Sequence, residues 1–462
     1  MATTIDDSMA ARISADCPDD TKQLLYHAWA HDTSDLKKLL DVPGKASARD
    51  PATGETPLHA AIRACGPAPQ SDTDNDADDT VSQEAAEAVH ELFLSGAIWN
   101  DVDSNDETPG CVAWRLGRKD LYRLCLEAGV RAELLFGLFD GYEELSSGSS
   151  AEEEDVEIIN VEDALPTEGE GENGVIVEKE TETEKQTTEQ TSANGDQDSK
   201  VPSTETATQD VTSEQYLASN LTYDPAKLVD DQGNGVMMAW ETSIMRRSVD
   251  ALLRQTSSPG PDNAPTTLPQ GKRILNIGFG MGIIDAMFAA TNPSRHHIIE
   301  AHPAVLAHID AGNTAFGSAW EASGPGEGAY KVHRGRWQDV LPQLLEAGEQ
   351  YDAIYFDTFG EDYAELKMFF TEYVPVLMDQ AGRFGFFNGL GADRRICYDV
   401  YTKVVEMHMV DVGMDVEWEE IDVDLKGMEE AGKGEWEDVR RRYWTLDKYR
   451  LPICTFMSGD IC

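Results

Sequence analysis

Glu241 stands where an acid is unexpected, inside the otherwise apolar stretch GVMMAWETSIM at residues 235–245. A carboxylate in such a place is either a solvated helix position or a functional group kept away from water, because burying a charge is costly unless it has a purpose or a partner. The setting between Trp240 and Met245 favours a functional carboxylate.

A glycine-rich turn and a second acid predict a nucleoside site. The stretch RILNI at 273–277 has the pattern of a short strand, and GFGMG at 278–282 leads directly into the helical pattern IIDAMFAA. Glycines let the backbone approach a ligand closely, and a helix N-terminus offers free N–H groups. A second strand pattern, HHIIEAH, reaches Glu300 about 20 residues after the turn, where an acid holds a ribose diol in nucleotide-binding folds.

The spacing of the glycines bears on which nucleoside is bound. A dinucleotide places its pyrophosphate on a GxGxxG turn, whereas this chain has GxGxG. That pattern suits S-adenosylmethionine, which carries no phosphate. A dehydrogenase that uses NAD stays open from this element alone.

Strand and helix patterns alternate through the rest of the chain. YKVHRG, YDAIYFDTFG and GRFGFFNG have strand patterns, WQDVLPQLLEAG and EDYAELKMFFTEYVPVLMD have helical ones, and GMDVEWEEI with RYWTLDKYRLPICTFM suggests a final antiparallel pair. This order predicts an α/β, doubly wound sheet with ligands at the C-terminal strand ends. Asp357 lies at one of those ends, although it could instead cap the following helix.

The N-terminal region, residues 21–139, contains an internal repeat. TPLHAA at 56–61 matches the ankyrin signature T-P-L-H-x-A, and a degenerate second copy, DETPGCVAWRLGRKDLYRLCLEAGV, begins at Asp106. An acidic insertion separates the copies, and LLYHAWAHDTSDLKKLLD predicts a helix pair upstream. In such repeats His59 ties the turn before the helix, so we expect it to be structural and the module to serve protein contact.

Composition divides the chain into three parts. Residues 140–213 are rich in Glu, Thr, Ser, Asp and Gln, which predicts a disordered acidic linker, and residues 214–462 form the second predicted domain. The net charge of −49 over 462 residues argues against a general nucleic-acid binder. The first residues show no secretory signal, no apolar run is long enough to span a bilayer, and seven cysteines without a CxxC pair fit reduced thiols.

Five stretches together resemble the guanidinoacetate N-methyltransferase family. They are MMAWETSIM, RILNIGFGMG, HHIIEAH, GRWQDVLPQL and YDAIYFDTF, in this order. With the repeat module added, the chain is similar to the fungal type IV protein arginine methyltransferases, which methylate the internal, delta (N5) nitrogen of an arginine in a ribosomal protein. The resemblance implies a mostly parallel, seven-stranded class I methyltransferase sheet after an all-α ankyrin-like module, with S-adenosyl-L-methionine as methyl donor.

The resemblance also implies the roles of individual residues. Glu241 and Asp357 match the catalytic carboxylates that grip the substrate guanidinium, a planar cation whose N–H donors suit two carboxylates. The residues that match positions around the cofactor are Trp240, Met245, Gly278, Phe279, Gly280, Gly282, Glu300, Trp337, Gln338 and Thr358. The chain departs from the family pattern in two places, since Gln338 replaces an acid and WETSIM replaces WETPYM. No metal site is predicted.

Three functions are compatible with these observations. The chain is expected to be a protein arginine methyltransferase, but an enzyme for a free guanidino metabolite and a scaffold with an inert methyltransferase fold stay open. The acidic charge and the repeat module favour a basic protein substrate, expected to be a ribosomal protein. We expect no direct contact with nucleic acid or membrane, a monomeric state, and a place in the cytoplasm and nucleus.

Overall fold

The computed structural model describes residues 5–69, 83–139, 211–224, 227–254, 270–428, 434, 436–437, 439–440 and 442–457. The predicted linker at 140–213 lies almost wholly outside these ranges, so its nature and the domain boundaries stay predictions. Among the described helices, none has both the length and the apolar content needed to cross a bilayer.

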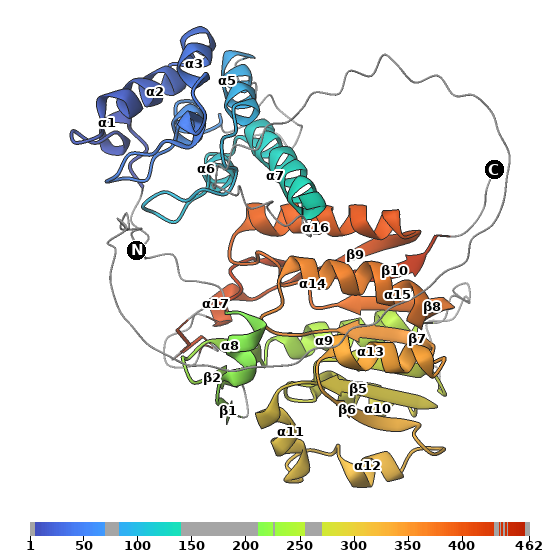
Figure 1. Cartoon of the computed structure of the whole chain (residues 1–462). Coiled ribbons are helices and arrows are strands. Elements are labelled where there is room, and N and C mark those ends of the chain that lie inside the picture. Colours follow the sequence, from blue (N-terminus) through green and yellow to red (C-terminus); the bar gives the residue numbers. More distant parts are fainter. Residues whose placement is uncertain are drawn as a thin grey trace, which may run out of the picture. The chain divides into compact units, whose positions relative to one another are not determined.

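A seven-stranded sheet is the centre of the C-terminal part (Figure 1). Its strand order is β6–β5–β4–β7–β8–β10–β9. The strands are β4 Arg273–Ile277, β5 Arg295–Glu300, β6 Tyr330–Arg334, β7 Tyr351–Phe356, β8 Met378–Phe386, β9 Met414–Asp422 and β10 Lys448–Phe456. All pairs from β6 to β8 are parallel, whereas β10 is antiparallel to both β8 and β9. The predicted mostly parallel sheet with a final antiparallel pair is confirmed.

Alternating side chains of the central strands build a separate core on each face of the sheet. On β4, Ile274 packs into a cluster with α9 and α10, while Leu275 packs into another with α13. On β7, Tyr355 joins the first cluster and Ile354 the second. Because successive strand residues point to opposite faces, helices must cover both sides, as a doubly wound sheet requires.

The helices of this part follow the strands closely. They are α8 Ser213–Ala218, α9 Glu241–Leu253, α10 Ile283–Ala289, α11 Pro303–Asp310, α12 Ser318–Ala322, α13 Trp337–Glu346, α14 Tyr363–Met368, α15 Val374–Leu377, α16 Arg395–Asp411 and α17 Leu425–Met428, with a π-helical turn η2 Phe369–Tyr373. A small antiparallel sheet, β1 Leu221–Asp224, β2 Lys227–Asp230 and β3 Gly235–Met238, precedes α9. This small sheet was not predicted.

The described N-terminal residues form helices and a 3-10 turn. These are α1 Met9–Arg12, α2 Asp19–Trp29, α3 Thr33–Leu40, η1 Lys45–Ser47, α4 Pro57–Arg63, α5 Gln83–Leu94, α6 Pro109–Arg115 and α7 Lys119–Phe139. The predicted upstream helix pair is confirmed as α2 and α3. Thr56 and Thr108 cap α4 and α6 in the same way, each accepting a hydrogen bond from the N–H three residues on. The assignment of these helices to the ankyrin class stays a prediction.

His59 is structural, as predicted. Its ring lies 2.8 Å from the Thr56 hydroxyl and 2.9 Å from the Glu107 carbonyl oxygen, so it joins the starts of both repeat copies. Burial lowers the pKa of His59 to about 4. The ring is therefore neutral near pH 7, with one nitrogen donating and the other accepting.

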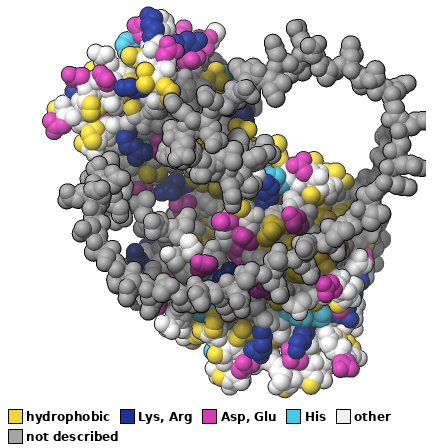
Figure 2. Space-filling model, in the orientation of Figure 1, with side chains coloured by type: hydrophobic (Ala, Val, Ile, Leu, Met, Phe, Trp, Pro, Cys, Tyr) yellow, Lys and Arg dark blue, Asp and Glu magenta, His cyan; other side chains and the backbone are white. Residues whose placement is uncertain are grey.

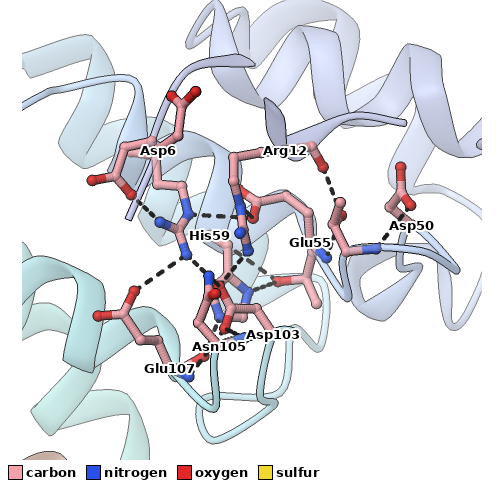
Figure 3. Close-up of polar contacts among 12 residues, drawn as sticks. Asp6, Arg12, Asp50, Glu55, His59, Asp103, Asn105 and Glu107 are labelled. Carbon is pink, nitrogen blue, oxygen red and sulfur yellow. Dashed lines mark hydrogen bonds and ion pairs between the residues drawn. The ribbon is translucent and has the colours of Figure 1, made fainter. Parts of the chain in front are cut away.

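A buried ionic network fixes the loops that precede α4 and α6 (Figure 3). Arg12 Nε donates to Glu55 Oε2 at 3.1 Å, and the guanidinium groups of Arg12 and Arg63 both donate to Asp103. Buried charges need such partners. Burial nevertheless raises the pKa of Glu55 to about 7.

Candidate active site

A cavity of about 250 Å³ opens where β4, β5 and β7 end. Ile277, Glu300 and Phe356, the last residues of these strands, all contribute to its lining. The predicted site residues that line it are Glu241, Gly278, Gly280, Glu300, Trp337, Gln338, Asp357 and Thr358. Some of these residues are more than a hundred positions apart in the sequence. The structure brings them together at the C-terminal strand ends, where ligands bind in such sheets.

Glu241 is the first residue of α9 and is only 3% exposed. The backbone N–H of Met238 donates to its Oε1 at 3.0 Å, and the Tyr443 hydroxyl donates to the same oxygen. Burial, and next the charge of Glu241, raise the pKa of Tyr443 well above its usual value, so the phenol keeps its proton and acts as a donor. The interpretation of Glu241 as a solvated helix position is wrong.

Asp357 directly follows β7, and its carboxylate has an unusual environment. Although the residue as a whole is partly exposed, its Oδ2 is enclosed and has no hydrogen-bond partner among the described residues. Burial raises the pKa of Asp357 to about 7. The cap of the following helix α14 is Asp362, which accepts a hydrogen bond from Glu365 N, so the capping alternative for Asp357 is wrong.

Glu300 holds the glycine turn in place. Its Oε2 accepts hydrogen bonds from Phe279 N at 2.9 Å and Gly280 N at 3.4 Å, and its Oε1 accepts one from His302 N at 2.6 Å. Burial raises the pKa of Glu300, against the lowering effect of these hydrogen bonds. A carboxylate oxygen has two lone pairs, and Oε2 already accepts two hydrogen bonds, so Oε1 is the atom of Glu300 that could accept from a ligand in the cavity.

Besides Asp357 Oδ2, the cavity lining carries two enclosed polar atoms that have no partner among the described residues, Gln338 Oε1 and Thr358 Oγ1. Gln338 Nε2 donates to Glu365 Oε2 at 2.7 Å, which fixes the amide with its oxygen unpaired. Beside it, Trp337 Nε1 donates to Glu361 Oε1 at 3.1 Å. An acceptor and a hydroxyl left unpaired in a cavity indicate a polar ligand.

The remaining predicted residues lie behind the cavity lining. Trp240 packs against Trp444 with ring centroids 5.4 Å apart, and Met245 is fully buried on α9. The Phe279 ring packs on Phe316, so its backbone N–H, bonded to Glu300, is the part nearest the site. Gly282 is the N-cap of α10, with φ +71°, and a Cβ there would overlap the Phe279 ring.

Other residues of the lining were not predicted as site residues. They include Tyr216, Arg336, Phe387 and Tyr443. Tyr443 lies in the stretch RYWTLDKYR, whose pattern indicates the last strand but carries no sign of a contact with Glu241.

Comparison of the sequence with known proteins relates this chain to methyltransferases. A family model described as guanidinoacetate N-methyltransferase matches residues 208–408. The chain is 60% identical to protein arginine N-methyltransferase 2 of Gibberella zeae, over 96% of this chain and 95% of that one, and 56% identical to the Neurospora crassa protein of the same name, over 98% and 99%. A solved structure of a putative SAM-dependent methyltransferase from Streptococcus mutans, 10% identical, overlaps 51% of this chain and 55% of its own with a TM-score of 0.31.

Proposed function

The chain belongs to the fungal protein arginine N-methyltransferase 2 family, and on that premise we propose that it transfers a methyl group from S-adenosylmethionine to the delta nitrogen of an arginine in a basic, ribosomal protein. One observation carries this proposal. Glu241 and Asp357 line the same cavity as the glycine turn, and Asp357 keeps an enclosed oxygen without a partner among the described residues. A carboxylate left in this state suits a cationic donor.

A guanidinium offers N–H donors and a positive charge that suit the two carboxylates. Its planar fork of N–H donors can pair with both acids at once, and its charge would lower the pKa of Asp357 towards the ordinary range. Phe387 and Tyr443 also line the cavity, and aromatic rings bind cations on their faces.

The geometry of a guanidinium supports the choice of nitrogen. Each terminal nitrogen has two N–H groups, so the terminal groups offer the stronger grip for Glu241 and Asp357. The internal nitrogen, which carries the side chain, is then the one left free to be methylated. Holding it in line with the methyl carbon can contribute up to about 7–11 kcal/mol to lowering the barrier.

The residues of the cavity fit S-adenosylmethionine. Glu300 would accept from the ribose hydroxyls, the unpaired Gln338 Oε1 from the adenine amine, and the turn from Gly278 would lie against the amino-acid end. When bound, S-adenosylmethionine supplies an electrophilic methyl group on a sulfonium, so transfer forms a nitrogen–carbon bond, leaves the electron pair on sulfur and releases one proton from the guanidinium. We assign that proton to Asp357, because its enclosed Oδ2 has no partner among the described residues and lines the cavity where the guanidinium would lie.

The basic partner is proposed from charge. The chain carries a net −49, and such a field speeds the encounter with a basic protein. On the face shown in Figure 2, the Asp and Glu side chains of the described residues lie among Lys and Arg. The attraction is therefore ascribed to the chain as a whole and not to one docking patch.

A free guanidino compound is the second candidate substrate. It is favoured by the family model matched at residues 208–408, which is described by guanidinoacetate. Both substrates present the same guanidinium, so the carboxylates alone do not separate them.

Labelled methyl transfer separates the candidates. The protein and its Glu241→Gln variant are incubated with methyl-labelled S-adenosylmethionine and either fungal ribosomal proteins or guanidinoacetate, and the labelled position is found by fragmentation mass spectrometry. We expect label on the delta nitrogen of a protein arginine with the wild type and none with the variant. Label on guanidinoacetate alone, or on terminal arginine nitrogens, would contradict the proposal.

A further inference from the structure

Helix α16 lies between the N-terminal helices and the catalytic sheet. Ile396, Val400 and Val404 belong to the hydrophobic core of the N-terminal helices, whereas Val405 and Met409 belong to the core formed with the sheet. These residues recur at helical spacing on two sides of α16. The N-terminal helices therefore contact an integral element of the methyltransferase domain.

Two glycines allow α16 to pack closely against the N-terminal helices. A Cβ on Gly110 of α6 would lie 2.6 Å from Ile396 Cγ1, and a Cβ on Gly129 of α7 would lie 2.6 Å from Val400 Cγ2. The first repeat copy, TPLH, has Leu58 where the second, TPGC, has Gly110. The second copy thus departs from the repeat pattern at the residue where α16 packs.

A chain of hydrogen bonds begins at this contact. The Tyr122 hydroxyl on α7 donates to Asp399 Oδ2 on α16, and Arg450 Nη1 on β10 donates to Asp399 Oδ1 at 2.7 Å. Tyr122 and Asp399 are both buried. A bond in this environment is stronger than the same bond in water, and its loss leaves a costly unpaired group.

The chain continues to a loop of the cavity. The Tyr398 hydroxyl accepts from Arg450 N at 2.8 Å and from Asn388 Nδ2 at 3.0 Å. Asn388 Nδ2 also donates to the Arg450 carbonyl oxygen at 3.3 Å, and the Tyr449 hydroxyl accepts from Asn388 N at 3.0 Å. Asn388, only 1% exposed, is therefore held on both its backbone and its side chain.

Asn388 stands between Phe387 and Gly389, which line the cavity. The Phe387 ring lies 6.5 Å from that of Tyr443, and Tyr443 donates to Glu241. The loop at 387–390 thus belongs to the carboxylate side of the cavity. The glycine turn and Glu300 are not members of this chain of contacts.

We infer that Tyr122, Asp399 and Arg450 are positioning residues through which α7 fixes the loop at 387–390 for the arginine substrate. The part of this inference that concerns arginine rests on the proposed function. Loosening the link is expected to weaken productive binding of the protein substrate while leaving the affinity for S-adenosylmethionine unchanged. The N-terminal helices then contribute to substrate placement even without touching the substrate.

The test compares Tyr122→Phe with Tyr401→Phe. The Tyr401 hydroxyl on α16 donates to Glu133 Oε2 on α7 at 3.2 Å, so it crosses the same helix contact without joining the link to Asp399. For Tyr122→Phe we expect faster hydrogen–deuterium exchange at residues 386–392 and a KM for the protein substrate raised about 2- to 30-fold, the range of coupling through such networks. The dissociation constant for S-adenosylmethionine should not change, and Tyr401→Phe should behave as wild type.

Equal effects of the two variants would reduce the link to simple helix packing and overturn the inference, as would no change in exchange with Tyr122→Phe. Exchange is measured without substrate, so the link is tested even if arginine methylation itself is not found. If Tyr122→Phe unfolds early, Asp399→Asn replaces it, since this change keeps the side-chain shape and removes the charge that pairs with Arg450. Wild-type exchange in that variant would likewise overturn the inference.

Discussion

Gly278 and Asp357 lie in backbone contact, so close that a Cβ on Gly278 would overlap the carbonyl oxygen of Asp357. Asp357 N also donates to the Ile277 carbonyl oxygen at 2.8 Å. The turn after β4 and the carboxylate after β7 are therefore held at one fixed spacing. In the proposed function this spacing sets the methyl donor against the guanidinium.

Replacing Gly278 should damage binding and catalysis together. Gly278→Ala adds a Cβ where the Asp357 carbonyl lies, at a backbone φ of +92°, so the two loops must separate. We expect kcat/KM to fall about 100-fold, the loss that a 1 Å misplacement can cause. Gly312→Ala is the control, because Gly312 has φ +74° but nothing within 4 Å of the added Cβ. Equal losses in both variants would show that backbone strain, and not the close approach, is responsible.

The activity should depend on pH through Asp357. The free carboxyl has a pKa of about 7, and only its ionised form can pair with a guanidinium. We expect kcat/KM for the protein substrate, which reports groups of the free enzyme, to rise through about pH 7 and then level off. A flat profile between pH 5.5 and 8.5 would argue against an ionised Asp357 in substrate binding.

Asp357 should also weaken the fold as pH rises from about 4 to about 7. Its pKa is raised from 3.8 to about 7 on folding, so between these values the folded chain keeps a proton that the unfolded chain has lost. Stability must then fall as pH rises through this window, by about 1.4 kcal/mol per unit between the two pKa values. Chemical unfolding of wild type and Asp357→Asn at pH 4 and pH 8 should show the wild type losing a few kcal/mol relative to the variant. No change in that difference would contradict the burial of an unpaired acid.

Tyr443 should affect the binding and methylation of the arginine substrate and not the binding of S-adenosylmethionine. Tyr443→Phe removes a donor to Glu241 Oε1 and leaves the hydrogen bond from Met238 N in place. A hydrogen bond to a charged group contributes about 1.5–3 kcal/mol. We expect kcat/KM for the protein substrate to fall about 10- to 150-fold, with unchanged binding of S-adenosylmethionine by calorimetry. Tyr330→Phe, which loses a hydrogen bond to the Pro293 carbonyl instead, should remain fully active. Weakened binding of S-adenosylmethionine by Tyr443→Phe would contradict the placement of Tyr443 beside the arginine substrate.

Periodicity and turn residues were sufficient to predict the catalytic sheet. The strand at Arg273–Ile277 has the bounds that the sequence indicated, and the dry setting of Glu241 followed from its apolar neighbours. The helical stretch after Asp357 was predicted without its interruption. The structure divides it into α14, a π-helical turn and α15, since Pro375 has no N–H to continue the ladder of hydrogen bonds.

Contacts between distant segments could not be predicted. Nothing near Tyr443 indicates that its hydroxyl meets Glu241, because a local pattern reports burial and period but not the partner. Likewise, from the sequence alone Gly110 looks like a random departure from the repeat pattern. The structure shows that Ile396 occupies the space that a side chain at position 110 would need. In both cases the cause lies in another part of the chain.

The role of the carboxylate pair is tested most directly by single-turnover methyl transfer. Wild type and Asp357→Asn are each saturated with labelled S-adenosylmethionine, with saturation checked by calorimetry, and mixed with a fungal ribosomal protein that the wild type labels. Removing one partner of a buried charge pair costs about 2–5 kcal/mol, so we predict a rate about 30- to several thousand-fold lower in the variant with cofactor affinity unchanged. A rate within about threefold of wild type, which is under 1 kcal/mol, would contradict the grip of Asp357 on the guanidinium.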